Sequence, residues 1–339
     1  MRQWRGALVG FGHVAVQGHL PAWQRQEDVR IVAVCDADSS RRALARELLP
    51  QARVYERMDE LLEKECVDFV DIATPPSCHA EQVEAAARAG VHVLCEKPLT
   101  TSLDEFVRMQ QCVRSAGVVL HTVHNWRFSE AYIALRQAMQ REQLGPIQQI
   151  SLKTIRPGCA AGAAGSWRLD PRLAGGGILV DHGWHAFYLL TELAGELPEA
   201  ISAAVSRRRY VDALVEDTAF CSVVFPCLKA DLHLTWAGRT RHTSWTIVAE
   251  GGQLRLENSR LEVQSARGAF SLDLPSPAAG SHHPDWFDGV IAEFRAALAQ
   301  PRAGYDNLCE AGLCVALLEQ AYRSAREQGR AIEVVVPCP

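Results

Sequence analysis

The sequence predicts an α/β protein of two domains, in which a parallel sheet covered by helices on both faces precedes a mostly antiparallel sheet. Three observations support this prediction. Strand and helix signals alternate over residues 1–122 with short links. Longer strand-like segments, several with alternating apolar and polar residues, dominate residues 123–339. A chain of 339 residues also exceeds one ordinary hydrophobic core.

The opening segment has the order of elements that a dinucleotide site needs. An apolar run at Ala7–Val9 enters a glycine turn, a helix-like segment follows, and Val29–Cys35 ends at an acid. Gly10 allows a tight turn and Gly12 lets the backbone approach a pyrophosphate at a helix N-terminus. The pattern therefore predicts a Rossmann domain. The expected cofactor contacts here are Gly10, Phe11, Gly12, His13, Val14, Ala15, Asp36 and Arg41.

The acid at the end of the second strand bears on the choice of cofactor. Asp36 can accept hydrogen bonds from a ribose diol, and its charge repels a 2′-phosphate. Arg41 and Arg42 follow closely and would pair with such a phosphate if the loop folded back. We therefore expect NAD rather than NADP.

Two further strands end in chemically suggestive turns. Residues 68–73 read as a buried strand stopped by Thr74-Pro75-Pro76, and 91–95 as a strand that runs into Glu96-Lys97-Pro98. Ligands of parallel sheets lie beyond the carboxyl ends of strands, so these turns and His79 are expected near the cofactor. Lys97 would there stabilise an alkoxide or polarise a carbonyl. From position alone, a surface lysine in a turn is an equally good interpretation.

The second domain is predicted around long strand-like segments. Helices are expected at 130–141, 181–194, 284–298 and 307–328, with strands at 147–155, 201–210, 218–225, 229–236, 244–250, 253–257 and 261–264. Residues 157–165 are rich in glycine, which is typical of a lid over a ligand and equally of a plain surface loop. Arg207-Arg208-Arg209 falls within a predicted strand and favours a solvated or intersubunit face.

One helix of this domain carries a candidate acid–base pair. Asp181 and His185 are four residues apart, so an α-helix would place both on one face. A carboxylate beside an imidazole orients the ring and raises its basicity. The alternative is a favourable first-turn charge at Asp181 and a core histidine at His185. His182 points to another face and would line the same cavity or a subunit contact.

Composition excludes several classes of protein. The net charge of −5 argues against nucleic acid, and no apolar run of membrane-spanning length occurs. The chain begins directly with a strand, which leaves no room for a signal peptide. Eleven scattered cysteines without a Cys-x-x-Cys pattern indicate reduced thiols in the cytoplasm. No metal site of zinc-type spacing and no Gly-x-Ser-x-Gly nucleophile motif is present.

Taken together, the motifs resemble the Gfo/Idh/MocA family of oxidoreductases over nearly the whole chain. The matching segments, in order, are Gly10-x-Gly12-x-x-Ala15, Asp36, Thr74-Pro75-Pro76-x-x-His79, Glu96-Lys97-Pro98, Asn125-x-Arg127-Phe128, Leu144-Gly145-Pro146-Ile147, Trp167-Arg168, Gly175-Gly176-Gly177, Asp181-x-x-x-His185 and Ala321-Tyr322-Arg323. Two departures are Ala15 in place of the third glycine and the bulky His182 and Trp184 beside the pair.

The resemblance implies a large, open, mostly antiparallel C-terminal sheet that often forms homodimer or homotetramer interfaces. It implies hydride transfer between NAD and a sugar, cyclitol or related polyol, with catalytic positions at Lys97, Asp181 and His185 and a cis Lys97–Pro98 bond. The expected substrate contacts are Asn125, Arg127, Trp167, Arg168, His182 and His185. Two alternatives are a redox-neutral hydrolase or lyase of the same family and a non-catalytic NAD-binding sensor.

Overall fold

The computed structural model describes residues 3–159, 166–275 and 283–336, and the chain divides into two compact units. The first comprises Met1–Asn125 with His282–Gly312, and the second Trp126–Ser281 with Leu313–Cys338. The first break lies close to the expected boundary at 122. Residues 282–312 pack with the first unit, whereas all of 123–339 was expected to form the second domain. Asn307 explains part of it, because its side chain accepts from the Thr122 N–H at 2.7 Å and donates to the Thr122 carbonyl at 3.1 Å.

The first unit is built on six parallel strands in the order β3-β2-β1-β4-β5-β6. This is the order of a doubly wound Rossmann sheet, and it confirms the predicted fold class. The strands are β1 (Trp4–Val9), β2 (Val29–Cys35), β3 (Arg53–Tyr55), β4 (Phe69–Ile72), β5 (His92–Cys95) and β6 (Leu120–Thr122). Leu8, Val34 and Val70 in the central strands are completely buried, so both sheet faces are covered.

The helices of the first unit follow from local signals as well as from packing. They are η1 (Ala15–His19), α1 (Leu20–Gln24), α2 (Ser39–Leu48), α3 (Met58–Lys64), η2 (Pro76–Cys78), α4 (His79–Arg88), α5 (Leu103–Ala116) and α9 (Pro284–Ala299). The Ser102 hydroxyl caps α5 by accepting the Glu105 N–H, whereas the Glu105 carboxylate accepts the Thr100 hydroxyl. α5 then ends at Gly117, whose φ of +67° suits glycine.

The second unit contains a nine-stranded sheet in the order β14-β13-β12-β11-β7-β10-β9-β8-β15. All neighbours are antiparallel except β7 and β10, which confirms the predicted mostly antiparallel sheet. Its strands are β7 (Ile147–Ile155), β8 (Ala200–Ser206), β9 (Thr218–Val224), β10 (Lys229–Thr235), β11 (His242–Ala249), β12 (Gly252–Glu257), β13 (Arg260–Ser265), β14 (Gly268–Asp273) and β15 (Ile332–Glu333).

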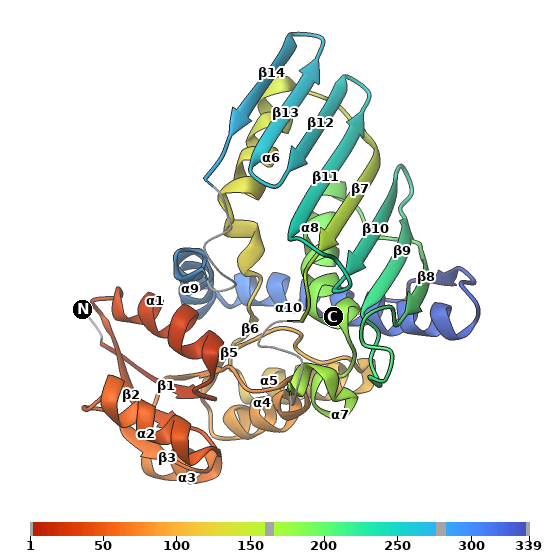
Figure 1. Cartoon of the computed structure of the whole chain (residues 1–339). Helices are drawn as coiled ribbons and strands as arrows, with labels where there is room; N and C mark the ends of the chain where they lie inside the picture. Colours follow the sequence, from red (N-terminus) through yellow and green to blue (C-terminus); the bar gives the residue numbers. More distant parts are fainter. Residues whose placement is uncertain (1–2, 160–165, 276–282, 337–339) are drawn as a thin grey trace. The chain divides into compact units, whose positions relative to one another are not determined.

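Helices cover one face of this sheet, as Figure 1 shows for α6 and α8. The helical segments that follow the first break are η3 (Asn125–Phe128), α6 (Glu130–Glu142), η4 (Trp167–Leu169), α7 (Pro171–Ala174), η5 (Leu179–Gly183), α8 (Trp184–Ala194) and α10 (Pro301–Arg326). The opposite face carries partly exposed side chains such as Phe220 and Val224. No helix among the described residues is long and apolar enough to span a bilayer.

Several predicted elements differ from the observed ones. The strand expected over 201–210 ends at Ser206, because the Asp217 carboxylate accepts the N–H groups of Arg208, Arg209 and Tyr210. Those N–H groups are therefore not available to a strand ladder. β14 was not expected, since all six of its residues are exposed and give no apolar face. Residues 160–165 of the expected lid segment and His282 lie outside the described residues.

Candidate active site

The glycine turn of the first unit has the shape that a dinucleotide needs. Gly10 has a φ of +86°, and a Cβ on it would lie 2.8 Å from the backbone of Ala73 and Thr74. Only glycine fits there, because β1 and β4 end side by side. A Cβ on Gly12 would meet no atom within 4 Å, so the turn opens into free space where the next helix begins. The turn therefore fits a pyrophosphate at a helix N-terminus.

Asp36 fixes this turn from the end of β2. Its carboxylate accepts the N–H of Phe11 at 2.6 Å and that of Asp38 at 2.8 Å. Carboxylate oxygens each accept more than one hydrogen bond, so capacity for a ribose hydroxyl remains. Arg42 is already engaged, since it donates to the Asp36 carbonyl at 2.9 Å and pairs with Glu56 at 2.8 Å. Contact of Asp36 and Arg41 with a cofactor stays a prediction.

Lys97 lies in a turn that is held in place by contacts with the buried side chains of Glu96 and His79. The Lys97–Pro98 bond is cis, as the resemblance implies, and the Lys97 N–H donates to the Glu96 carboxylate at 2.9 Å. His79 is completely buried, with Nδ1 2.9 Å from the Pro98 carbonyl and Nε2 2.9 Å from the Thr74 carbonyl. Burial lowers the pKa of His79, and a neutral imidazole donates from only one nitrogen. His79 therefore donates to one of these two carbonyls and lies against the other, so its ring packs between the two turns.

Glu96 is itself part of a buried network that the sequence analysis missed. His19 Nδ1 lies 2.8 Å from the Asp71 carboxylate, and Nε2 lies 3.0 Å from Glu96. Trp23 also donates to Asp71 at 2.7 Å. Burial alone lowers the pKa of His19, but the two carboxylates outweigh it and raise the pKa to about 10. A cationic His19 thus lies between two acids, one of which holds the Lys97 turn.

The position of Asp71 is the sequence signal for this network. It is the one acid within the apolar run of β4, and its exposed fraction is 0%. A buried carboxylate needs a partner, so a histidine or arginine elsewhere in the domain was the group to search for. His19 lies in η1, on the first helix after the glycine turn.

In the second unit, aromatic contacts hold His185. Its ring stacks on Trp126, with centroids 4.3 Å apart and an interplanar angle of 8°. Its Nδ1 lies 3.0 Å from the Tyr188 hydroxyl, which also accepts the Trp126 N–H at 2.9 Å. The side chain is almost fully buried. Tyr188 was not predicted, although it lies three residues after His185 and therefore on the same helical face.

Asp181 and His182 belong to the turn that precedes α8. This turn, η5, is π-helical, so the α-helical spacing assumed for Asp181 and His185 does not apply directly. The Asp181 carboxylate lies 3.3 Å from His182 Nδ1. The His182 ring meets Trp126 edge-on at 5.9 Å, which places it in the same aromatic cluster as His185. The pairing of Asp181 with His185 stays a prediction.

The segment that leads into η5 and α8 is hydrogen-bonded to a buried acid. Glu216 accepts the N–H groups of Gly177 at 3.1 Å and Leu179 at 3.0 Å, and the Tyr322 hydroxyl at 2.8 Å. Burial raises the pKa of Glu216 in spite of these hydrogen bonds. A Cβ on Gly177 would lie 1.8 Å from the Glu216 carbonyl oxygen, and one on Gly176 would lie 2.1 Å from Tyr322. Gly176 and Gly177 are thus required by the close approach of these two residues, whereas Gly175 ends α7 with a φ of +77°.

One arginine lies beside the aromatic cluster, and two others make contacts elsewhere in the second unit. The Arg127 guanidinium lies 5.5 Å from the Tyr188 ring centroid, next to His185's hydrogen-bond partner, and pairs with Glu192 at 3.8 Å. Arg168 stacks on Trp167 at 4.4 Å. Burial and then the charge of Arg241 lower the pKa of Arg156 to about 10. Substrate contacts of Asn125, Arg127, Trp167 and Arg168 stay predictions.

Comparisons with known proteins agree with this architecture. Residues 4–124 match the model of an oxidoreductase family with an NAD-binding Rossmann fold, and residues 132–255 match a GFO/IDH/MocA C-terminal domain. The chain is 30% identical to D-apiose dehydrogenase of Paraburkholderia graminis, over 98% of this chain and 90% of that protein.

Solved structures share the whole fold. An oxidoreductase from Agrobacterium radiobacter, in complex with NAD+, L-tartaric acid and magnesium, has a TM-score of 0.84 and 23% identity over 98% of both chains. A levoglucosan dehydrogenase in complex with NADH has a TM-score of 0.84 and 20% identity, over 98% of this chain and all of that one. These two likenesses show the fold alone.

Proposed function

The chain belongs to the Gfo/Idh/MocA family of oxidoreductases, and from this premise we propose that it is an NAD-dependent dehydrogenase of a sugar, cyclitol or related polyol. The observation that carries the proposal is the pair of supported groups at Lys97 and His185. Each belongs to a motif at a family position, and each is fixed by buried residues around it.

The glycine turn and Asp36 would hold the cofactor. Gly10 allows the tight turn, Gly12 leaves room for the pyrophosphate, and the carboxylate would accept hydrogen bonds from the adenosine ribose. When bound, the dinucleotide accepts hydride from, or donates it to, the substrate carbon. The negative charge of Asp36 repels a 2′-phosphate, so NAD is preferred over NADP.

The chain's own residues would handle the proton and the oxygen. In the oxidative direction, His185 takes the substrate hydroxyl proton through the ring nitrogen that is not directed at Tyr188. Asp181 stabilises the charged imidazole, and the Lys97 ammonium stabilises the negative charge that grows on the substrate oxygen. Each contribution would be worth a factor of about 10² to 10⁴ in turnover.

The test is turnover of a panel of sugars, cyclitols and polyols with NAD and, separately, NADP. NADH formation followed at 340 nm is expected with at least one substrate class, and no net absorbance change across the panel contradicts the proposal. His185→Ala and Lys97→Met should lower kcat by about 10²-fold or more with little change in NAD affinity. Equal losses in kcat and NAD affinity would contradict the assigned roles.

Matched controls separate chemistry from general damage. His242→Ala removes a histidine of β11 and Lys64→Met removes an exposed lysine of α3, both outside the proposed site. Both variants should retain turnover within about twofold. Titration of each variant with NAD and NADP tests the cofactor preference, and tighter NADP binding would contradict it.

A further inference from the structure

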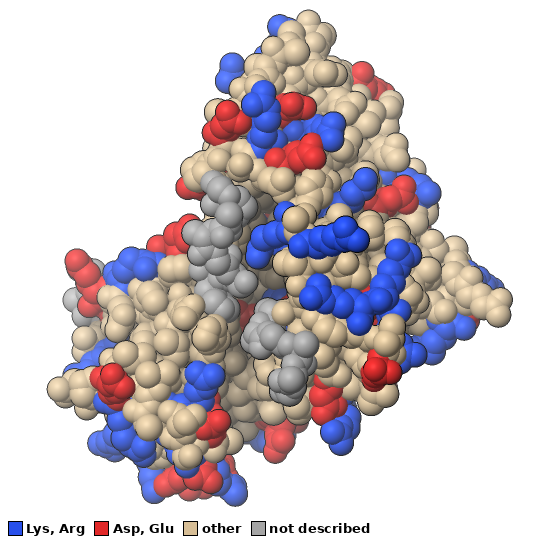
Figure 2. Space-filling model, viewed as in Figure 1, with Lys and Arg blue, Asp and Glu red and all other residues tan. Residues whose placement is uncertain are grey.

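The sheet of the second unit carries an arginine that the proposed function does not use. Arg156 directly follows β7, and it is only 7% exposed. Figure 2 shows other Lys and Arg side chains at the surface, where water solvates their charges. Burial of a guanidinium group costs free energy unless neighbouring groups compensate its charge and accept its N–H groups. The groups around Arg156 therefore decide whether its role is structural.

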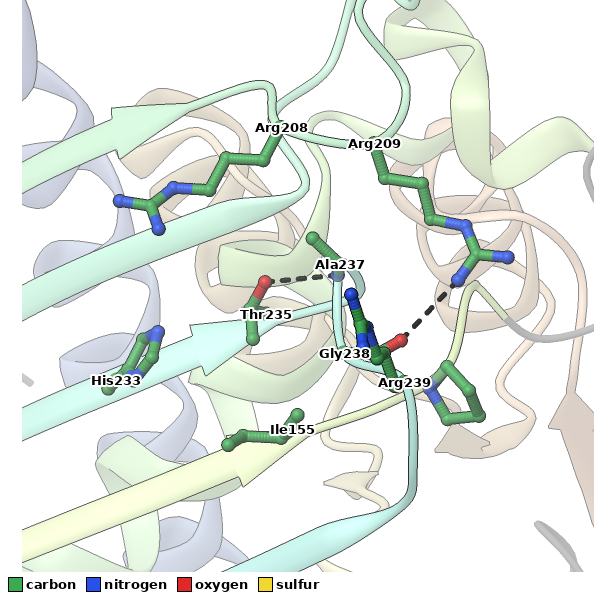
Figure 3. A pocket seen from close by; sticks show the side chains of 9 residues that line it. Ile155, Arg208, Arg209, His233, Thr235, Ala237, Gly238 and Arg239 are labelled. Atoms are coloured by element: carbon green, nitrogen blue, oxygen red, sulfur yellow. Dashed lines mark hydrogen bonds between the residues drawn. The ribbon is translucent and has the colours of Figure 1, made fainter.

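The strand pairing places this side chain on the helix-covered face of the sheet. Arg156 continues the ladder of β7, because its N–H donates to the Thr235 carbonyl at 2.8 Å and its carbonyl accepts the Gly238 N–H at 3.1 Å. Side chains alternate between the two faces along a strand, so Arg156 lies on the same face as the buried Thr154. Ile155, between them, lies on the opposite face, where it lines a pocket (Figure 3).

Asp181 belongs to a segment that covers this same face. It lies in η5, which packs on β10. A Cβ on Gly183 would lie 3.5 Å from the Leu234 side chain, and Leu234 is paired with Thr154 in the parallel register of β7 and β10. The charge of Asp181 therefore acts on Arg156: burial lowers the pKa of Arg156, and the carboxylate opposes that effect. Arg156 thus lies on the side of the sheet that carries the proposed acid–base groups.

The protein satisfies only part of the Arg156 guanidinium group. All of its side-chain hydrogen bonds use Nη1, which donates to the carbonyls of Ile155 at 2.9 Å and His242 at 3.1 Å and to the Thr243 hydroxyl at 3.0 Å. Nε is buried and has no partner among the described residues. Nη2 is not fully enclosed, and it donates to none of the described residues either. One side of the group therefore anchors it to the sheet, and the Nη2 side remains available to a ligand.

The charge of Arg156 is not compensated by a direct ion pair. Among the described acids, only Asp181 has a charge that acts on it, and the two groups form no ion pair. Residues outside the described ranges include no Asp or Glu. Arg241 also acts on Arg156, but Arg241 is exposed, so water screens its charge. A ligand group beside Arg156 must accept a hydrogen bond, and the carboxylate of Asp181 disfavours an anion there. A hydroxyl meets both conditions.

We propose that Arg156 is a further substrate-binding residue, which donates from Nη2 to a hydroxyl oxygen of the polyol other than the one that is oxidised. The inference rests on the proposed function, and it adds that the substrate is a neutral polyol. Loss of a hydrogen bond to a charged group should weaken substrate binding about 10- to 100-fold. Because the bound hydroxyl does not react, the same contact is present in the ground state and the transition state. Its loss should therefore raise KM and leave kcat nearly unchanged.

The experiment measures substrate binding and turnover separately. The NADH-saturated protein is titrated by calorimetry with D-glucose, D-xylose and myo-inositol, and with D-gluconate and D-xylonate as matched acids. NADH cannot accept a hydride, so this titration measures binding without reaction. Turnover of the same compounds is then followed with NAD. We expect a neutral compound to bind more tightly than its acid. In Arg156→Met, its dissociation constant and KM should rise about tenfold or more, and kcat should change by less than about threefold.

Thr243→Val is the matched control. It removes one acceptor of Nη1 and leaves Nη2 in place, so it tests the structural bonds of Arg156 alone. The free energy of unfolding in urea should fall in this variant, and the dissociation constant should change by less than about twofold. Arg156→Lys keeps the positive charge but lacks the planar fork. It replaces the Met variant if that protein does not fold, and binding should again weaken.

Three results would overturn the inference about Arg156. They are an unchanged dissociation constant in a folded Arg156 variant, equal weakening in Thr243→Val, and tighter binding of an acid than of its neutral partner. The second would show a purely structural role, and the third would show that the guanidinium group takes a carboxylate. The proposed function fails separately, if neutral compounds bind to the NADH complex but none is oxidised with NAD. Binding of none of the compounds would overturn the inference as well.

Discussion

The two units support their candidate catalytic groups in different ways. Beneath Lys97 the support is ionic, because a protonated His19 lies between Asp71 and Glu96. Around His185 the support comes from aromatic stacking and close packing. Trp126 stacks on the ring, and Glu216 packs against Gly177 at the start of the helix that carries His185. The two candidate catalytic groups should therefore respond to different kinds of change. Charge and pH should disturb the first site, and added volume should disturb the second.

The largest expected effect comes from removing the central cation of the first unit. His19→Leu would leave two buried carboxylates without their shared partner, and loss of one member of a buried ion network costs about 3–5 kcal/mol. The free energy of unfolding measured in urea should fall by that amount. Turnover should fall as well, because Glu96 also holds the Lys97 turn. A loss below 1 kcal/mol would contradict the ionic support.

The corresponding test of the second unit is Gly177→Ala. The new methyl group would have to displace the Glu216 carbonyl, which lies 1.8 Å from its position, so the start of the His185 helix must shift. We expect a loss of about 3 kcal/mol in unfolding free energy and a large loss of kcat. Gly195→Ala is the control, since its Cβ would meet no atom within 4 Å and its φ of +67° alone costs about 1 kcal/mol. Equal losses in both variants would argue against steric support.

The pH dependence of stability sharpens the contrast. The pKa of His19 is about 10 in the folded protein against 6.5 for a free histidine, so its stabilising contribution is complete below pH 6.5. That contribution is lost as the pH rises toward 10, by at most about 1.4 kcal/mol per pH unit. Urea unfolding of the wild type and His19→Leu at pH 6.5, 8 and 9.5 measures it. The difference between the two proteins should shrink with pH, and a constant difference would contradict a cationic His19.

The smallest expected effect on stability is that of Tyr188→Phe. This change removes one hydroxyl that contacts His185 Nδ1 and accepts the Trp126 N–H, at a cost of about 1 kcal/mol. The more informative readout is the pH profile of kcat/KM, whose limb assigned to His185 should move while NAD affinity stays constant. Thr191→Val, which removes a hydroxyl bonded to the Phe187 carbonyl one turn later on α8, should leave that profile in place. An unmoved profile in Tyr188→Phe would show that Tyr188 does not tune His185.

Local patterns sufficed where a residue's role depends on its neighbours in the chain. The strand, glycine turn and following helix predicted the Rossmann order, and alternation predicted the antiparallel sheet. Asp36 directly follows β2, as predicted, and its carboxylate accepts the Phe11 N–H of the glycine turn, whereas its contact with a cofactor stays a prediction. The cis Lys97–Pro98 bond followed from family resemblance, not from any local pattern.

What the sequence by itself determined is therefore the class of both sheets and the positions of the candidate reactive groups. Tertiary structure alone decided their environment: which acid meets His19, why Glu216 and Tyr322 require glycines, and that 282–312 packs with the first unit. The physical reason is the separation along the chain over which each effect acts. Strand and turn preferences act over a few neighbouring residues, whereas a buried charge or a close backbone approach depends on segments that only the folded chain brings together.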